Sequence, residues 1–208
     1  MKAIINKTMA IVASFCAIVS CEKFTHGNDN DESSQFDPRV DIVLTKSEEE
    51  ILSANNTFAV NLFVAENVIN EIKNKCFSPL SANIALMMLA NGASGEVYDD
   101  LVKGMGLEGY NLQDMNSLYK ALLEGLERAD KSATLRTANG VWCNNRIGVL
   151  DSYKASMETT YSARVEDIDF TLSESKDMIN GWCKEETDGL VDDITSFIDD
   201  FEHSDCVY

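Results

Sequence analysis

The stretch CFSPLSANIALMMLANGASG, residues 76–95, predicts a helix without a polar face, because residues 84–90 are apolar at every position. Ser78 fits the N-cap, where a hydroxyl accepts an unpaired backbone N–H of the first turn. Pro79 suits the next position, since its missing N–H would have had no partner there. Asn91-Gly92 predicts the end of the helix. A helix that is apolar all round must be covered on every side, so we expect it inside a folded domain.

The first twenty residues have the features of an export signal. Lys2 and Lys7 accompany an apolar run, residues 9–19, that is too short to span a bilayer as a helix. The run ends in Ile18-Val19-Ser20-Cys21, which resembles a bacterial lipobox, whose cysteine becomes the first mature residue and carries the lipid. We therefore expect a lipoprotein signal at 1–20, lipidation at Cys21, and an exported protein that is anchored to a membrane or extracellular. An ordinary secretory signal with a chance cysteine is the alternative.

The strongly negative charge restricts the partners. The formal net charge is −18, and loss of the two lysines of residues 1–20 would lower it to −20. Such a charge disfavours nucleic acid and anionic lipid surfaces as partners. Residues 21–46 predict an acidic tether with a short extended lead-in at its end, since they are polar and poor in branched apolar residues. Residues 47–208 are long enough for one domain with its own core.

The residues that usually carry chemistry are few and scattered. The tether and the domain contain four cysteines besides Cys21: Cys76, Cys143, Cys183 and Cys206. Their spacing contains no CxxC pair, so we expect no metal site and favour free, partly buried thiols, although an exported protein could pair some of them. His26 and His203 are the two histidines, one in the tether and one in an acidic loop. We therefore expect neither an enzyme nor a cofactor.

The hydrophobic pattern predicts helices interleaved with a few strands. Helices are expected at 47–72, 79–92, 94–106, 111–131, 150–161 and 173–186, and strands at 75–77, 133–145 and 165–170. A capping box beginning at Ser47 would start the first helix, and Ser94 and Ser173 would cap two others. Residues 192–205 predict a loose acidic tail before apolar residues 206–208. The strands are too few and too separated for a doubly wound sheet, which indicates the α+β class.

Five short motifs together resemble one family, the serpins. They are Asn56-Thr57-Phe58-Ala59 with Asn61-Leu62-Phe63, then Phe77-Ser78-Pro79-Leu80-Ser81, Thr137-Ala138-Asn139-Gly140-Val141-Trp142, Tyr161-Ser162-Ala163-Arg164-Val165 with Asp169-Phe170, and Ile179-Asn180-Gly181-Trp182 with Thr187 and Gly189. Each motif is weak alone, but the five follow the order and spacing of the family. The resemblance covers residues 50–208.

The resemblance implies a fold and an activity. It places helix 79–92 as the central helix behind the family's large sheet, and Ser78 and Ser81 in the shutter, where that sheet opens. It implies inhibition of a serine or cysteine protease as a suicide substrate. The protease cleaves a reactive loop, and insertion of that loop into the sheet traps the enzyme.

The same resemblance limits what residues 1–208 are expected to do. They match roughly the N-terminal half of the family domain and lack the reactive loop, so we expect no inhibition by this chain alone and cannot derive the target protease from it. Helix 111–131 balances Lys120, Arg128 and Lys131 with four acidic residues, which disfavours a heparin-type polyanion as partner. A non-inhibitory serpin-like binding module, or a decayed gene product, is the alternative.

Overall fold

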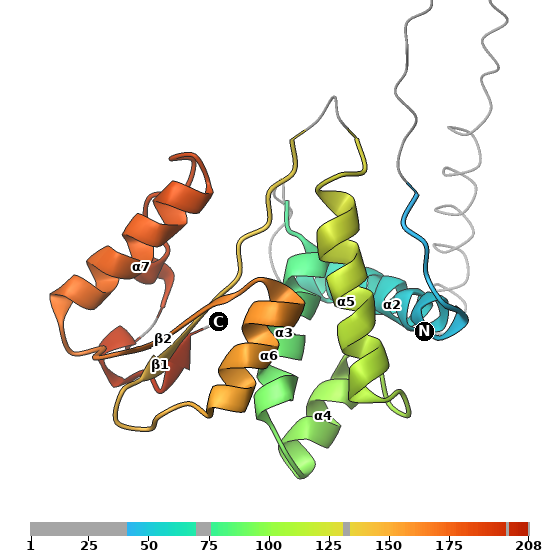
Figure 1. Cartoon of the computed structure of the whole chain (residues 1–208), viewed down its shortest axis with the longest axis horizontal. Coiled ribbons are helices and arrows are strands. Elements are labelled where there is room, and N and C mark those ends of the chain that lie inside the picture. Colours follow the sequence, from blue (N-terminus) through green and yellow to red (C-terminus); the bar gives the residue numbers. More distant parts are fainter. Residues whose placement is uncertain (1–40, 70–75, 131–133, 199, 208) are drawn as a thin grey trace, which may run out of the picture. The chain divides into compact units, whose positions relative to one another are not determined.

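Six α-helices and a small sheet make up the described part of the computed structural model, which comprises residues 41–69, 76–130, 134–198 and 200–207. The helices are α2 (Lys46–Ile69), α3 (Pro79–Gly92), α4 (Glu96–Gly104), α5 (Leu112–Leu126), α6 (Asp151–Tyr161) and α7 (Ser173–Glu186), with short 3-10 turns η1 (Thr195–Phe197) and η2 (Phe201–His203) (Figure 1). All of these residues belong to one compact unit. The predicted signal, Cys21 and most of the tether lie outside the described residues.

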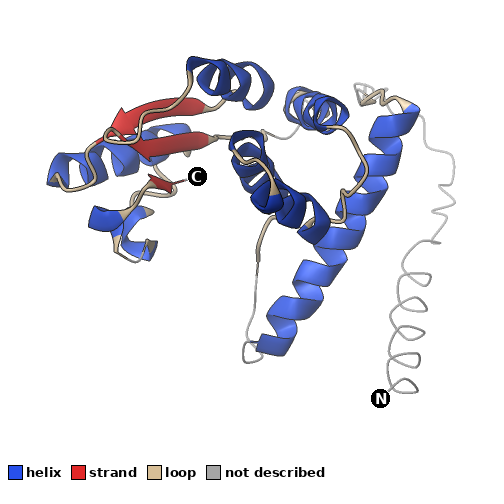
Figure 2. Ribbon diagram, turned by 90° about the horizontal axis from the view of Figure 1, so that it is seen from below, coloured by secondary structure: helices blue, strands red, loops and turns tan. Residues whose placement is uncertain are grey.

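Three strands form the sheet, in the order β2-β1-β3 (Figure 2). The central strand β1 (Gly140–Asn144) pairs in parallel with β2 (Arg164–Ile168), and α6 lies in the connection between the two. The third strand β3 (Cys206–Val207) pairs with β1 in the antiparallel sense. Helices and one small sheet share the core, so the predicted α+β class is confirmed.

Both faces of β1 are buried, and each face belongs to a different cluster. Val141 and Cys143 join the main core with residues of α2 to α6, whereas Trp142 packs with Phe170, Ile179 and Phe201 on the side of α7. A strand that is covered on both faces has a continuous apolar sequence, which is the pattern of Gly140–Asn144 before its final asparagine. The strand is shorter than predicted, because residues 134–139 are not strand and Leu135 is exposed.

The all-apolar helix α3 is covered by other helices. It contacts α2, α4, α5 and α6, and it buries Ile84, Met87, Met88 and Ala90. Leu80 and Leu86 pack against the same core while keeping part of their surface exposed. The prediction of a helix that ends at Asn91-Gly92 is confirmed.

Several predicted boundaries were wrong. Residues 76–77 are not strand, and Ser94 caps nothing, because α4 begins after Gly95. Leu172, not Ser173, precedes α7, and α5 ends at Leu126. The apolar face predicted for the first helix is buried only near its start: Ile51 is fully covered, whereas Phe63 and Val68 are exposed. Among the described residues no helix combines the length and the apolarity needed to cross a membrane.

The capping box at the start of α2 lies two residues earlier than predicted. The Thr45 backbone N–H donates to Glu48 Oε2 at 2.7 Å, and Thr45 Oγ1 accepts the Glu48 N–H at 3.3 Å. The Ser47 hydroxyl instead donates to Asp114 Oδ2 of α5 at 2.8 Å. Glu48 Oε1 also accepts the Ser117 hydroxyl at 2.7 Å, so this buried carboxylate joins the beginning of α2 to α5.

We expect Glu48 to make stability depend on pH. Hydrogen bonds from Thr45 and then Ser117 hold the pKa of Glu48 below its ordinary value of 4.5. A lowered pKa stabilises the fold above the unfolded value and loses that contribution as pH falls through the folded value. Glu48→Gln should therefore cost about 2 kcal/mol at pH 7, since hydrogen bonds to a charged group are lost, and should lose less stability than the wild type below pH 4.5.

Urea unfolding between pH 3 and pH 7 measures this effect. Glu49→Gln is the matched control, because Glu49 lies in the same helical turn and is exposed. The control should keep the pH dependence of the wild type. Parallel curves for wild type and Glu48→Gln at all pH values would contradict the assignment.

Candidate functional site

The two serines that the resemblance places in the shutter lie together at the start of α3. Ser78 is the N-cap, and its Oγ accepts the Ser81 backbone N–H at 3.2 Å. The Ser81 hydroxyl donates to the same Ser78 Oγ at 2.9 Å. Both residues are exposed in the described structure, so their side chains satisfy each other while remaining accessible. The predicted capping by Ser78 is therefore confirmed; control of sheet opening stays a prediction.

Asn83 is a polar residue of this helix that sequence reasoning missed. It is 2% exposed, and its Oδ1 has no hydrogen-bond partner. A buried carbonyl oxygen without a partner costs roughly 1–3 kcal/mol, so such atoms are rare in folded proteins. The signal was present in the sequence, as a single asparagine at the edge of an uninterrupted apolar run.

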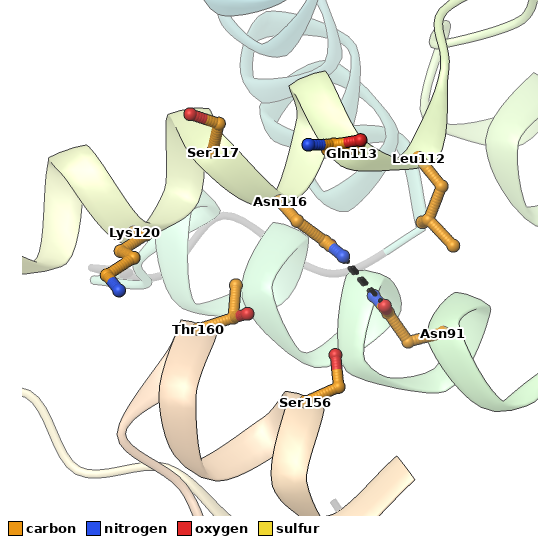
Figure 3. Close-up of a pocket in the computed structure, with 8 residues that line it drawn as sticks. All are labelled: Asn91, Leu112, Gln113, Asn116, Ser117, Lys120, Ser156 and Thr160. Carbon is orange, nitrogen blue, oxygen red and sulfur yellow. Dashed lines mark hydrogen bonds between the residues drawn. The ribbon is translucent and has the colours of Figure 1, made fainter. Parts of the chain in front are cut away.

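A second polar group joins three helices beside a surface hollow (Figure 3). Asn91 of α3 and Asn116 of α5 exchange two hydrogen bonds of 2.9 Å between their amide groups. The Tyr161 hydroxyl of α6 donates to Asn116 Oδ1 at 2.7 Å and accepts from Asn91 Nδ2 at 3.3 Å. Burial raises the pKa of Tyr161 well above its ordinary value, so this hydroxyl keeps its proton. The sequence suggested Asn91 only as a helix end.

The hollow itself has a volume of about 550 Å³ and a mostly uncharged lining. Its walls come from Asn91, from five residues of α5 and from Ser156 and Thr160 of α6 (Figure 3). Lys120 is the one charged residue of this lining, and its ammonium lies 4.0 Å from Glu124. Arg128 is 3.9 Å from the same carboxylate, while Lys131 lies outside the described residues. Glu124 thus offsets both Lys120 of α5 and Arg128, which lies just beyond the end of α5, as the sequence suggested.

The acidic segment after α7 is ordered, contrary to the prediction of a loose tail. Asn180 of α7 accepts the backbone N–H groups of Ile194 and Thr195 at 3.0 and 3.2 Å. Phe201 is buried and meets Phe170 edge to face, with 5.0 Å between ring centroids. Asn180 belongs to the last family motif of the sequence, and the structure gives it the role of holding this segment against α7.

The groups that could perform chemistry are dispersed. His203 is exposed and bonds to Asp200 at 2.6 Å, which raises the pKa of its imidazole. Cys76 is exposed, Cys143 and Cys183 are buried, and Cys206 is half-buried; all four are free thiols. Within the described ranges no group of three or more His, Cys, Asp and Glu residues could hold a metal ion.

Comparison with known proteins decides the family. A family model described as "Serpin (serine protease inhibitor)" matches residues 53–204. The chain belongs to the serpin family. The match covers α3 to α7, most of α2 and the strands β1 and β2, so the resemblance seen in five short motifs is confirmed.

Relatives match this serpin over most of its length but only part of theirs. The leukocyte elastase inhibitor of Sus scrofa is 29% identical over 70% of this chain and 39% of its own. Serine protease inhibitor A6 of Xenopus laevis is 27% identical over 84% of this chain and 42% of its own. The chain thus spans about two fifths of the length of these curated relatives.

Solved serpins agree with the fold. The thermophilic serpin tengpin in its latent state is 26% identical, with a TM-score of 0.65, over 79% of this chain and 42% of its own. Human thyroxine-binding globulin is 25% identical, also with a TM-score of 0.65, over 77% of this chain and 43% of its own. The described elements therefore correspond to about two fifths of a serpin fold.

Proposed function

We propose that residues 1–208 are the N-terminal part of a serpin that inhibits a serine or cysteine protease as a suicide substrate. The match of residues 53–204 to the serpin model is the observation that carries this proposal. Relatives named as elastase and serine protease inhibitors support it. The partner is a target protease, whose identity depends on the reactive loop. The protein acts as a substrate that traps an enzyme and has no catalysis or cofactor of its own.

In this proposal, the start of α3 controls how the large sheet opens. Ser78 and Ser81 are exposed and bonded to each other, so either hydroxyl can take another partner by a small rotation. Asn83, two residues further along, is buried on the other face of α3, because two residues turn the helix by about 200°. The two exposed serine hydroxyls therefore give this end of α3 its polar edge, which further polar groups of a complete sheet can bind.

A protease assay tests the proposed inhibition. The 208-residue polypeptide should form no SDS-stable complex with any member of a panel of serine and cysteine proteases, because it covers only about two fifths of its inhibitory relatives. The product of the complete coding sequence should form one with at least one member. A covalent complex with the 208-residue polypeptide would contradict the first expectation.

A non-inhibitory serpin that binds a ligand is the second candidate. It is favoured by the similarity to human thyroxine-binding globulin, a family member whose name states a binding role. If every protease cleaves the complete protein without forming a stable complex, and the cleaved protein stays folded, that result would support this alternative. A complete protein that is cleaved and then degraded would instead indicate a decayed gene product.

We also propose that the protein is exported and anchored to a membrane by lipid at Cys21. The lipobox-like Ile18-Val19-Ser20-Cys21 after an apolar run supports this. Stable anchoring needs more than one acyl chain, since a single chain binds membranes only marginally. Radiolabelled palmitate should enter the wild type in a bacterial host, and Cys21→Ala should lose the label completely. Cys16→Ala, within the expected signal, is the control and should keep it; label retained by Cys21→Ala would contradict the proposal.

A further inference from the structure

Two free thiols lie side by side on the neighbouring strands β1 and β3. Cys143 of β1 is the register partner of Cys206 of β3 in the antiparallel pair. The neighbouring pair is hydrogen-bonded, since the Asn144 N–H donates to the Asp205 carbonyl at 2.7 Å. Hydrogen-bonded and non-hydrogen-bonded pairs alternate along an antiparallel ladder, so Cys143 and Cys206 form a non-hydrogen-bonded pair.

This kind of pair suits a disulfide. Its Cα atoms are about 4.5 Å apart and its side chains approach more closely than in the hydrogen-bonded kind. Disulfides need a Cα separation of roughly 4.4–6.8 Å, so the strands can accept the bond without moving apart. We propose that Cys143 and Cys206 form a disulfide that fastens β3 to β1. The inference rests on the strand register and, for its oxidant in the cell, on the export proposed above; it does not depend on protease inhibition.

The folded sheet also indicates when the bond forms. Burial first, and then the adjacent Cys206 thiol, raise the pKa of Cys143 to about 12. The other strand beside β1 is β2, and it pairs Asp167 with Cys143. The Asp167 carboxylate lies 2.6 Å from the Lys154 ammonium. The thiolate is the nucleophile in thiol–disulfide exchange, so buried Cys143 reacts slowly once β3 is docked. The bond therefore forms while β3 is still docking.

The chemistry needs a disulfide oxidant, such as oxidised glutathione or a thiol–disulfide oxidoreductase. The half-exposed Cys206, as its thiolate, attacks one sulfur of the oxidant and breaks the oxidant's S–S bond. The attacked sulfur forms a mixed disulfide with Cys206, and the other sulfur leaves as the first thiol once it takes up a proton. Cys143, as its thiolate, then attacks the Cys206 sulfur and releases the second thiol. Both cysteine protons pass to the two released thiols, and two electrons pass from the protein to the oxidant. An oxidising compartment, as for the export proposed above, supplies such oxidants.

The bond would stabilise an element that has few other attachments. β3 is two residues long, and besides its strand pairing Asn144 Nδ2 donates to the Ser204 carbonyl at 3.2 Å. The disulfide would close a loop of about 60 residues, and loops of that size give substantial stabilisation by restricting the unfolded chain. For a chain of this size the melting temperature should rise on the order of 10 °C.

Peptide mapping of the full chain tests the proposal. The chain is refolded from urea with oxidised and reduced glutathione, its free thiols are alkylated, and it is digested with trypsin. Peptide 137–146 should be linked to peptide 185–208 in most molecules, and a reducing agent should separate them. Cys76 and Cys183 should be alkylated. Full alkylation of Cys143 and Cys206, or a link between either of them and another cysteine, would overturn the proposal.

Two matched variants show whether the rise in melting temperature comes from the Cys143–Cys206 disulfide and not from the loss of a cysteine in general. Cys183→Ser replaces another buried cysteine and should keep the 143–206 link and the rise in melting temperature on oxidation. Cys206→Ser changes a half-buried position and should remove both. Oxidant added after folding in the reduced state should form the link at least tenfold more slowly than oxidant present during refolding. Equal rates would show that the docked strand does not protect Cys143.

Discussion

Tyr161→Ala is expected to destabilise the described domain by about 4 kcal/mol. Tyr161 is fully buried at the end of α6, and its ring lies 6.3 Å from that of Tyr119. Truncation of a buried aromatic ring to alanine typically costs about 3–5 kcal/mol, since it removes apolar contacts and leaves a cavity. The loss should be large because α3, α5 and α6 all meet at this side chain through the hydroxyl or the ring.

Tyr161→Phe separates the hydroxyl from the ring. The phenylalanine keeps the packing and removes the 2.7 Å bond to Asn116, while Asn91 and Asn116 still bond to each other. Both amides therefore keep a partner, and the cost should be about 1 kcal/mol. Urea unfolding of both variants measures the difference. A cost above about 3 kcal/mol for Tyr161→Phe would show that the hydroxyl, not the ring, holds the three helices together.

Local signals predict the elements whose contacts are local. The sequence predicts both ends of α3, and at its start Ser78 and Pro79 act within one turn of their own positions. The same holds for α6 and for the course of α7. The family is also predictable, because it depends on the order and spacing of short motifs along the chain and not on contacts between distant residues.

Long-range partners account for what the sequence does not predict. Two sequences at the start of α2, Thr45-x-x-Glu48 and Ser47-x-x-Glu50, both fit a capping box. Which of them forms the box depends on α5, because Asp114 binds the Ser47 hydroxyl and Ser117 binds the Glu48 carboxylate. The pattern of the tail predicts a loose segment because its acidic residues outnumber its apolar ones. Its order comes from Asn180 and from the burial of Phe201, neither of which has a periodic signature. Within the candidate site, a motif identifies the serines, whereas Asn83 stands out only once its burial is known.

Gly140→Ala is expected to destabilise the domain by about 2 kcal/mol, although alanine is only one methyl group larger. Gly140 and Trp142 lie on the same face of β1, because side chains alternate along a strand. A Cβ at Gly140 would lie 2.7 Å from Trp142 Cζ3 and 2.9 Å from Cζ2, and closer still to Cη2. The indole cannot withdraw freely, since it is 2% exposed and meets Trp182 edge to face with 4.8 Å between ring centroids. Overpacking of this kind typically costs about 1–3 kcal/mol.

Gly181→Ala is the matched control for this substitution. Gly181 lies in α7, is exposed, and has open space for at least 4 Å around the point where an alanine methyl would lie, so alanine should stabilise the helix by about 0.5–1 kcal/mol. The chain has two tryptophans, and both belong to the affected pair, so fluorescence reports directly on the change. We expect Gly140→Ala to shift the native emission and lower the urea midpoint, and Gly181→Ala to raise the midpoint with unchanged emission. The two Asn-Gly motifs, Asn139-Gly140 and Asn180-Gly181, would then use glycine for different reasons. Gly140 of β1 makes room for the Trp142 indole, whereas Gly181 only weakens α7.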